Sequence, residues 1–351
     1  MKRFYILLLV FALLLSGCSW MDGEYHSVKP HDAAGNAPIS VSGVTVKNYT
    51  ELRDALIKQV DSGLTEVNIY VTDMSRDMLE KYMDTAIKHV MQNNAIGAYA
   101  VKDIRYEIGT RGGRAAIAVD VSYIHNRQEI LRIKHTEKME SFLRLVDFAL
   151  NDCDDSMVIK VSNFEDMDIV QYIQDYVNDH PDRCMELPQV SVSLYPDKGS
   201  ERVVELTFTY QTSRDALRIM QNMVTPIFSA AKLYVQDSQG AEQKYEQLHS
   251  FLMERFDYKV ETSITPAYSL LRYGVGDSKA FAGVYRTMCE SAGLECQVIS
   301  GTKDGEAWYW NRIKLEDGYY HVDLVGDKNS GFKPTQTKHM EGYVWDYSLY
   351  P

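Results

Sequence analysis

The chain has 351 residues, of which 45% are hydrophobic, so it can bury substantial cores and is long enough for two or three domains. That composition excludes a disordered chain. Its formal net charge of −12 disfavours nucleic acid, and anionic membrane or wall polymers, as partners of a broad surface, and we expect no nucleic-acid partner.

The first residues predict export and a lipid anchor. Lys2 and Arg3 precede an apolar run from Phe4 to Leu15, which is too short to span a bilayer as a helix but suits the core of a signal peptide. The run ends in "LSGC", which resembles a bacterial lipobox, where a cysteine is acylated and becomes the mature N-terminus. We therefore expect residues 1–17 to be a lipoprotein signal peptide and Cys18 to hold the protein on the extracytoplasmic side of the cell membrane.

The rest of the chain divides into four segments. Residues 18–45 mix Gly, Pro, Ser, Asp and Asn without apolar periodicity, which predicts a flexible tether. Residues 46–135 and 136–225 have matching patterns and are predicted to be two copies of one unit. Residues 226–351 form the predicted C-terminal domain.

Each copy of the unit has the order α-β-α-β-β. The corresponding elements are strands at 67–71 and 158–161, helices from about 75 and 166, and hairpin turns at 112–113 and 196–199. The hairpin strands alternate apolar and polar residues, which indicates a small antiparallel sheet with helices on one face. The predicted fold class is therefore α+β, with two such repeats followed by a further α+β domain. We expect the repeats to serve as spacers or binding surfaces.

Four cysteines follow Cys18, at positions 153, 184, 289 and 296. They form no CxxC motif and have no histidine at zinc-finger spacing, so we expect neither a metal nor a cofactor. Export permits disulfides. Because Cys153 precedes the strand at 158–161 and the next helix should run back across the sheet, we expect a disulfide between Cys153 and Cys184.

The stretch "YGVGDSKAFA" predicts a glycine turn that leads into a helix. Apolar residues at 281, 284, 285, 288 and 292 share one face of that helix, which places Ser278 at or just before the N-terminus of a buried helix. "ECQVISG" then predicts a strand, and "EAWYWNRIKLEDGYYHVDLVGD" predicts a hairpin that turns at Asp317 and Gly318.

These three blocks resemble the motifs of the transglutaminase-like family, whose papain-type core uses a cysteine, a histidine and an aspartate. "GVGDSKAFA" is similar to the family's cysteine motif, "EAWYW" to its "H-A-W" block and "YYHVD" to its "W-Y-H-V-D" block. The resemblance covers roughly residues 243 to 351. It implies that Ser278 takes the position of the nucleophile, Glu306 that of the general base and Asp323 that of the orienting acid.

Two of these three residues depart from the family pattern, which implies an inactive site. A serine hydroxyl is a weaker acid than a phenol of pKa ~10, so its pKa exceeds that of a glutamate (~4.3) by more than about 6 units, or roughly 8 kcal/mol. Glu306 is therefore too weak a base to activate Ser278, and its charge opposes an anion beside it. Structural roles suit the residues better: Asp277 or Ser278 as the helix cap, Asp323 as an acceptor for backbone donors, and Glu306 as a solvated hairpin residue.

The sequence contains two alternative catalytic arrangements. His321 lies two residues before Asp323 on the same strand face, so a Ser278–His321 dyad is one alternative. The family places a histidine there without using it as the base. Cys289 as a displaced nucleophile is the second alternative, but its place near the buried stripe favours a small apolar filler.

Three functions compete. The first is a tethered protein with an inactive domain that binds a peptide, glycan or protein, with Trp308, Trp310 and His321 as candidate binding residues, although Trp308 also suits the core. The second is an active hydrolase or transferase that uses a non-standard Ser278 site. The third is a structural envelope protein whose repeats make the contacts.

The leader generates the first testable prediction. Mass spectrometry of the mature N-terminus is expected to find an acylated Cys18, because the short apolar run ends in a lipobox. An unmodified N-terminus at another residue would disprove this.

Overall fold

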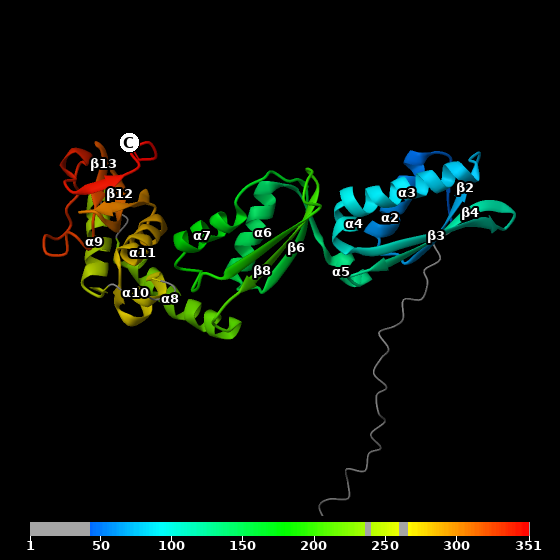
Figure 1. The fold of residues 1–351 in the computed structure, drawn as a ribbon. Helices are drawn as coiled ribbons and strands as arrows, with labels where there is room; N and C mark the ends of the chain where they lie inside the picture. The colour runs from blue at the N-terminus through cyan, green and yellow to red at the C-terminus, as the bar shows by residue number, and fades with distance from the viewer. Residues whose placement is uncertain (1–42, 236–239, 260–265, 351) are drawn as a thin grey trace, which may run out of the picture.

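The computed structural model describes residues 43–235, 240–259 and 266–350. Three four-stranded sheets follow one another along these residues, each with its own helices (Figure 1). The α+β fold class is therefore confirmed. Cys18, the signal peptide and nearly all of the predicted tether lie outside the described residues. None of the described helices combines the length and apolar character that crossing a membrane requires.

The first sheet comes from residues 44–123. Its elements are β1 (Val44–Val46), α2 (Tyr49–Asp61), β2 (Glu66–Val71), α3 (Arg76–Asn93), α4 (Ala95–Ala100), β3 (Val101–Arg111) and β4 (Arg114–Tyr123). The strand order is β1-β2-β4-β3, with β1 parallel to β2 and the other neighbours antiparallel. Helices α2 and α3 pack over the sheet through fully buried side chains such as Leu52, Met83 and Ile117 (Figure 1).

The second sheet has the same strand order and the same strand directions. After α5 (Arg127–Arg132), its elements are β5 (Lys134–Lys138), α6 (Met139–Asn151), β6 (Ser156–Asn163), α7 (Ile169–Asp179), β7 (Gln189–Tyr195) and β8 (Arg202–Thr209). The order is β5-β6-β8-β7, and β5 is parallel to β6. Both sheets thus contain a short parallel edge strand ahead of the first long helix. The apolar pattern did not predict either strand: β5 has the polar sequence KHTEK, and β1 is only three residues long, VTV, at the end of the predicted tether.

A long helix joins the second sheet to the C-terminal domain. Helix α8 (Arg214–Tyr234) runs without a break through residue 225, where a domain boundary was predicted, and the boundary at 135 falls within β5. The buried face of α8, with Leu217, Val224 and Phe228, belongs to the same apolar core as Tyr245 of the C-terminal domain. The two parts therefore share packed side chains.

The C-terminal domain packs helices against the third sheet. Its elements are α9 (Ala241–Met253), β9 (Asp257–Tyr258), α10 (Pro266–Tyr273), β10 (Val275–Gly276), α11 (Ser278–Ser291), β11 (Cys296–Lys303), β12 (Glu306–Leu315), β13 (Gly318–Val322), the 3-10 helix η1 (Thr337–His339) and β14 (Tyr343–Trp345). The sheet order is β13-β12-β11-β14, with every neighbouring pair antiparallel. Helix α11 packs on β12 through contacts that include the Asn311 amide, which donates to the Ala282 carbonyl at 2.9 Å.

The predicted disulfide between Cys153 and Cys184 is wrong, because both thiols are free and buried. Amide groups hold each sulfur in place instead. The Gln221 side chain donates to Cys153 Sγ at 3.7 Å, and Cys184 Sγ donates to Asn151 Oδ1 at 3.9 Å. Burial is the largest cause that raises the pKa of both thiols above the ordinary value, which disfavours the thiolate that disulfide chemistry needs.

Candidate active-site region

Ser278 is the first residue of α11 and points at the sheet. The preceding Asp277 is the helix cap, and its carboxylate accepts the Ala280 N–H at 2.9 Å, as one of the two predicted cap residues should. Ser278 is 6% exposed, and its hydroxyl oxygen accepts the Tyr309 N–H of β12 at 3.3 Å. The described contact of the hydroxyl is therefore with a backbone donor and not with a base.

Gly276 explains why a glycine turn precedes this helix. A Cβ atom added there would lie 3.0 Å from both Ala280 Cβ and Leu270 Cβ, closer than nearly all real contacts. The chain between β10 and α11 thus passes tightly against α10, and this positions Ser278.

Asp323 follows β13 and is 3% exposed. Its Oδ2 atom accepts hydrogen bonds from Lys303 Nζ at 3.0 Å, Trp308 Nε1 at 2.8 Å and the Tyr343 hydroxyl at 2.6 Å. Its Oδ1 atom accepts the Gly326 N–H at 2.8 Å. The predicted role as an acceptor for a backbone donor is therefore confirmed, and four donors occupy the carboxylate.

Lys303 supplies the charge that balances this carboxylate. Its ammonium group lies 5.3 Å from the centroid of the Trp308 ring and 4.9 Å from that of Tyr343, so two aromatic rings flank the ion pair. Burial is the first cause, and the hydrogen bond to Asp323 the second, that raise the pKa of the Tyr343 hydroxyl. Tyr343 therefore stays a neutral donor to Asp323.

Glu306 lies apart from these two groups. It is exposed at the beginning of β12, where it is paired in register with Lys303 of β11. In the part of the chain that the structure describes, no hydrogen bond or ion pair joins Glu306 to Ser278 or to Asp323. The three positions implied by the family resemblance thus do not form a hydrogen-bonded triad.

Trp310 and His321 are part of the core. Trp310 is 0% and His321 1% exposed, and Trp310 Nε1 donates to His321 Nδ1 at 3.0 Å. His321 Nε2 lies 3.2 Å from Thr337 Oγ1. Neither side chain offers a surface to a ligand, which corrects their assignment as binding residues. Both nitrogens of His321 are also engaged away from Ser278, so the contacts do not support a Ser278–His321 dyad.

The other candidates are accounted for by packing. Trp308 is half-buried, and its indole N–H serves Asp323. Cys289 is 0% exposed, and burial raises the pKa of its thiol well above the ordinary value, so it is an apolar filler and not a nucleophile. The described residues contain no group of three or more His, Cys, Asp or Glu side chains that could hold a metal ion.

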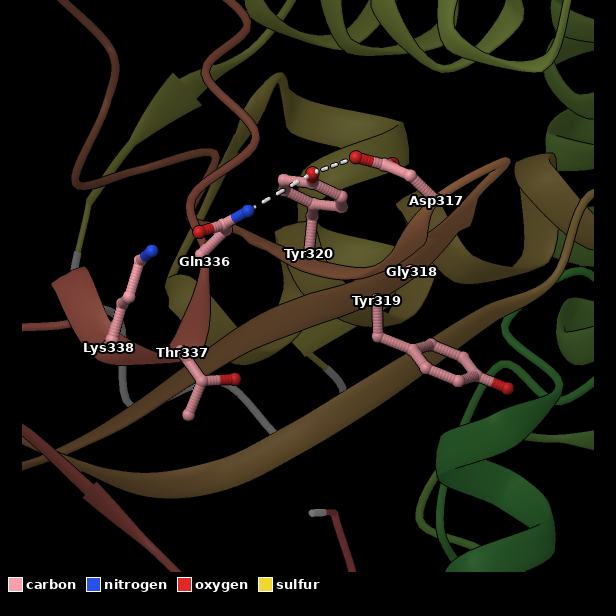
Figure 2. A pocket seen from close by; sticks show the side chains of 7 residues that line it. All are labelled: Asp317, Gly318, Tyr319, Tyr320, Gln336, Thr337 and Lys338. Carbon is pink, nitrogen blue, oxygen red and sulfur yellow. Dashed lines mark hydrogen bonds between the residues drawn. The ribbon is translucent and has the colours of Figure 1, made fainter.

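A cavity of about 300 Å³ lies at the other end of the β12–β13 hairpin (Figure 2). Its lining residues are Asp317, Gly318, Tyr319, Tyr320, Gln336, Thr337 and Lys338. One wall lies on the predicted hairpin, whereas the other comes from residues 336–338, which follow a segment without apolar periodicity and cannot be placed beside the hairpin from the pattern.

The buried carboxylate generates a stability prediction. Replacing Asp323 with Ala is expected to lower the free energy of unfolding of the C-terminal domain by about 3 to 5 kcal/mol, because it leaves the Lys303 ammonium without its partner. The matched control Glu306→Ala, at an exposed position on the same strand as Trp308, is expected to change it by less than about 0.5 kcal/mol. Urea unfolding of both variants measures this, and equal losses would contradict the described network.

Two buried histidines generate a pH prediction. Burial lowers the pKa of both His249 and His321 to about 4. In the unfolded chain each histidine has a pKa of ~6.5. Between about pH 6.5 and about pH 4 the unfolded chain therefore binds protons that the folded chain does not bind, and the free energy of unfolding falls as the pH falls through this range. The expected loss between pH 7 and pH 5 is about 2 kcal/mol per histidine.

Urea unfolding at the two pH values checks this loss. His321→Gln is expected to reduce the pH dependence, whereas His339→Gln, at an exposed position, is expected to leave it unchanged. A His321→Gln variant with the same pH dependence as the wild type would contradict the prediction.

The model of the transglutaminase-like superfamily matches residues 229–324. No curated protein matches the chain.

Three similar solved structures are described as a TGase, the calcium-bound LapG of Legionella pneumophila and the periplasmic domain of TgpA from Pseudomonas aeruginosa. Their sequence identities are 9%, 13% and 14%, and their TM-scores are 0.29, 0.27 and 0.19. The alignments cover 60%, 39% and 40% of this chain and 63%, 75% and 63% of the other chains. This chain thus spans less than two thirds of the length of the first of these structures. The family match includes Ser278, Glu306 and Asp323, and it identifies residues 229–324 of the chain as a transglutaminase-like domain.

Proposed function

We propose that this protein is a lipoprotein, anchored through Cys18 on the extracytoplasmic side of the cell membrane, whose transglutaminase-like domain binds a peptide, glycan or protein and does not catalyse a reaction. The main support for the non-catalytic role is the set of contacts made by Asp323. This residue is the acid that would orient a catalytic base, and it is paired with the Lys303 ammonium and three further donors.

Catalysis by such a site needs a nucleophile, a base within hydrogen-bond reach and a group that orients the base. Ser278 has its hydroxyl bonded to the Tyr309 N–H, and Glu306 is exposed and makes no hydrogen bond to it in the described chain. The pKa gap of more than about 6 units between a serine hydroxyl and a glutamate adds to this geometric argument. Both observations support a non-catalytic role.

Lys303 does not replace the missing base. An ammonium group has three donors and no acceptor, so it cannot take a proton from Ser278 while it is protonated. The Lys303 ammonium instead donates to Asp323 Oδ2 and lies against two aromatic rings. The lysine thus pairs with Asp323 and supplies no proton acceptor for Ser278.

The anchor is inferred from the leader sequence. An apolar core of twelve residues, Phe4 to Leu15, followed by "LSGC" suits lipidation at Cys18, and the polar residues after it suit a tether. The folded units would then work close to the membrane surface without spanning it.

An activity assay tests the non-catalytic role. The wild type and Ser278→Ala are each incubated with a glutamine peptide plus a primary amine, and with a mixture of unmodified peptides. We expect no turnover above background in either case, measured by mass spectrometry of the products. Turnover that Ser278→Ala abolishes would instead establish the active hydrolase or transferase and overturn the proposal.

A binding assay tests the proposed binding role of the folded domains. The chain without residues 1–18 is expected to co-sediment with isolated cell envelopes, although it carries no lipid, because the folded domains provide the contacts. Full recovery of this chain in the supernatant would contradict a binding role.

A further inference from the structure

We propose that the free edge of β13, beside the cavity at the end of the β12–β13 hairpin, binds the C-terminal end of an extended peptide as an added strand. This inference rests on the proposed binding function and assigns it a site and a ligand class. The site lies away from Ser278 and Asp323.

Among the described residues, the backbone of one outer-edge residue of β13, Tyr319, has no hydrogen-bond partner. His321 exchanges two backbone hydrogen bonds with Thr335, at 2.7 and 2.8 Å, on the side of β13 that faces away from β12. Hydrogen-bonding direction alternates along an antiparallel strand, so the N–H and C=O of Tyr319 point to the same outer edge. The hairpin agrees with this alternation, since its two-residue turn is closed by Leu315 and Gly318.

The chain that covers His321 does not continue to Tyr319. A ladder extended from the His321–Thr335 pair would place Thr337 opposite Tyr319, but Thr337 instead begins the 3-10 helix η1. The cavity lies where the two segments separate, between the hairpin end and Gln336, Thr337 and Lys338 (Figure 2). Its volume of about 300 Å³ is at the lower limit for ligand sites, which suits a short chain segment.

The Tyr319 ring favours a peptide over a sugar. Arg312 Cζ lies 3.9 Å and Lys314 Nζ 4.3 Å from the ring centroid, and the hydroxyl donates to Glu295 at 2.9 Å. A sugar that stacked on the ring would have to compete with these two cations, whereas a strand added to the backbone edge would not. They also hold the edge residue in a fixed position, which reduces the entropy lost when a strand is added.

Two charged side chains at the cavity define which end of the peptide lies where. Figure 2 shows Lys338 and Asp317 on opposite sides of the Tyr320 ring. The described residues offer Lys338 no hydrogen-bond or ion-pair partner, so its ammonium is available to a terminal carboxylate. Asp317 is held by the Tyr320 hydroxyl at 2.7 Å, which Gln336 Nε2 supports at 3.3 Å, and it faces the preceding part of the peptide. A basic side chain there would complement it.

Binding of two pentapeptide pools to the purified chain tests the inference. The pools have identical random sequences and differ only in a free or an amidated C-terminus. The free-carboxylate pool is expected to be retained at least tenfold better, with enrichment of Lys or Arg before the last residue. Lys338→Gln should remove the preference, whereas Tyr319→Phe, which keeps the backbone edge, should retain it. Equal retention of both pools, or an unchanged preference in Lys338→Gln, would overturn the inference.

The backbone contact is tested on the ligand and needs no change in the protein. In an enriched peptide, methylation of the one backbone nitrogen that faces Tyr319 should reduce binding at least tenfold, and methylation of either neighbouring nitrogen should not. Equal tolerance at all positions would exclude strand addition.

These experiments distinguish failure of the peptide site from failure of the proposed function. Ser278-dependent turnover with intact peptide binding would disprove only the non-catalytic role. Envelope retention without any effect of Lys338→Gln would disprove only this site.

Discussion

The Asp323 carboxylate holds the C-terminal sheet together at one point. Its Oδ2 atom accepts from Lys303 on β11, Trp308 on β12 and Tyr343 on β14, and Asp323 itself follows β13. Every strand of the sheet thus contributes to a single buried acceptor. A buried carboxylate is tolerated only when its charge and lone pairs are satisfied, so the position of each strand depends on those of the others.

The fold of this domain was predictable where the signal is local. Apolar residues at 281, 284, 285, 288 and 292 fixed α11, and the glycine turn with Asp277 fixed where the helix begins. The partner of Asp323 was not predictable in this way. Lys303 lies twenty residues earlier and contacts Asp323 only because β11, β12 and β13 are neighbours in the sheet. The periodicity of apolar residues in the sequence carries no information about such a contact.

Contacts between segments that are distant in the sequence also explain why the predicted disulfide and the predicted binding residues were wrong. Cys153 and Cys184 both lie near the ends of elements, as expected, but amide partners from Gln221 and Asn151 hold the two sulfurs, and one of those amides comes from the distant helix α8. From the alternation of side chains along their strands, Trp310 and His321 were predicted to line an exposed groove. They are instead covered by the segment that carries Trp345, whose ring centroid lies 5.5 Å from that of Trp310.

The crowding around Asp323 also restricts the substitutions that would let this acid orient a catalytic histidine. A chain with a cysteine at 278 and a histidine at 306 would still find its orienting acid engaged by Lys303. If Lys303 were lost first, the buried acid would stand without a counter-charge, which typically costs about 3 to 5 kcal/mol. Freeing the acid to orient a base would therefore take several substitutions together. The ion pair between Lys303 and Asp323 thus links the availability of this acid as an orienting group to the stability of the domain.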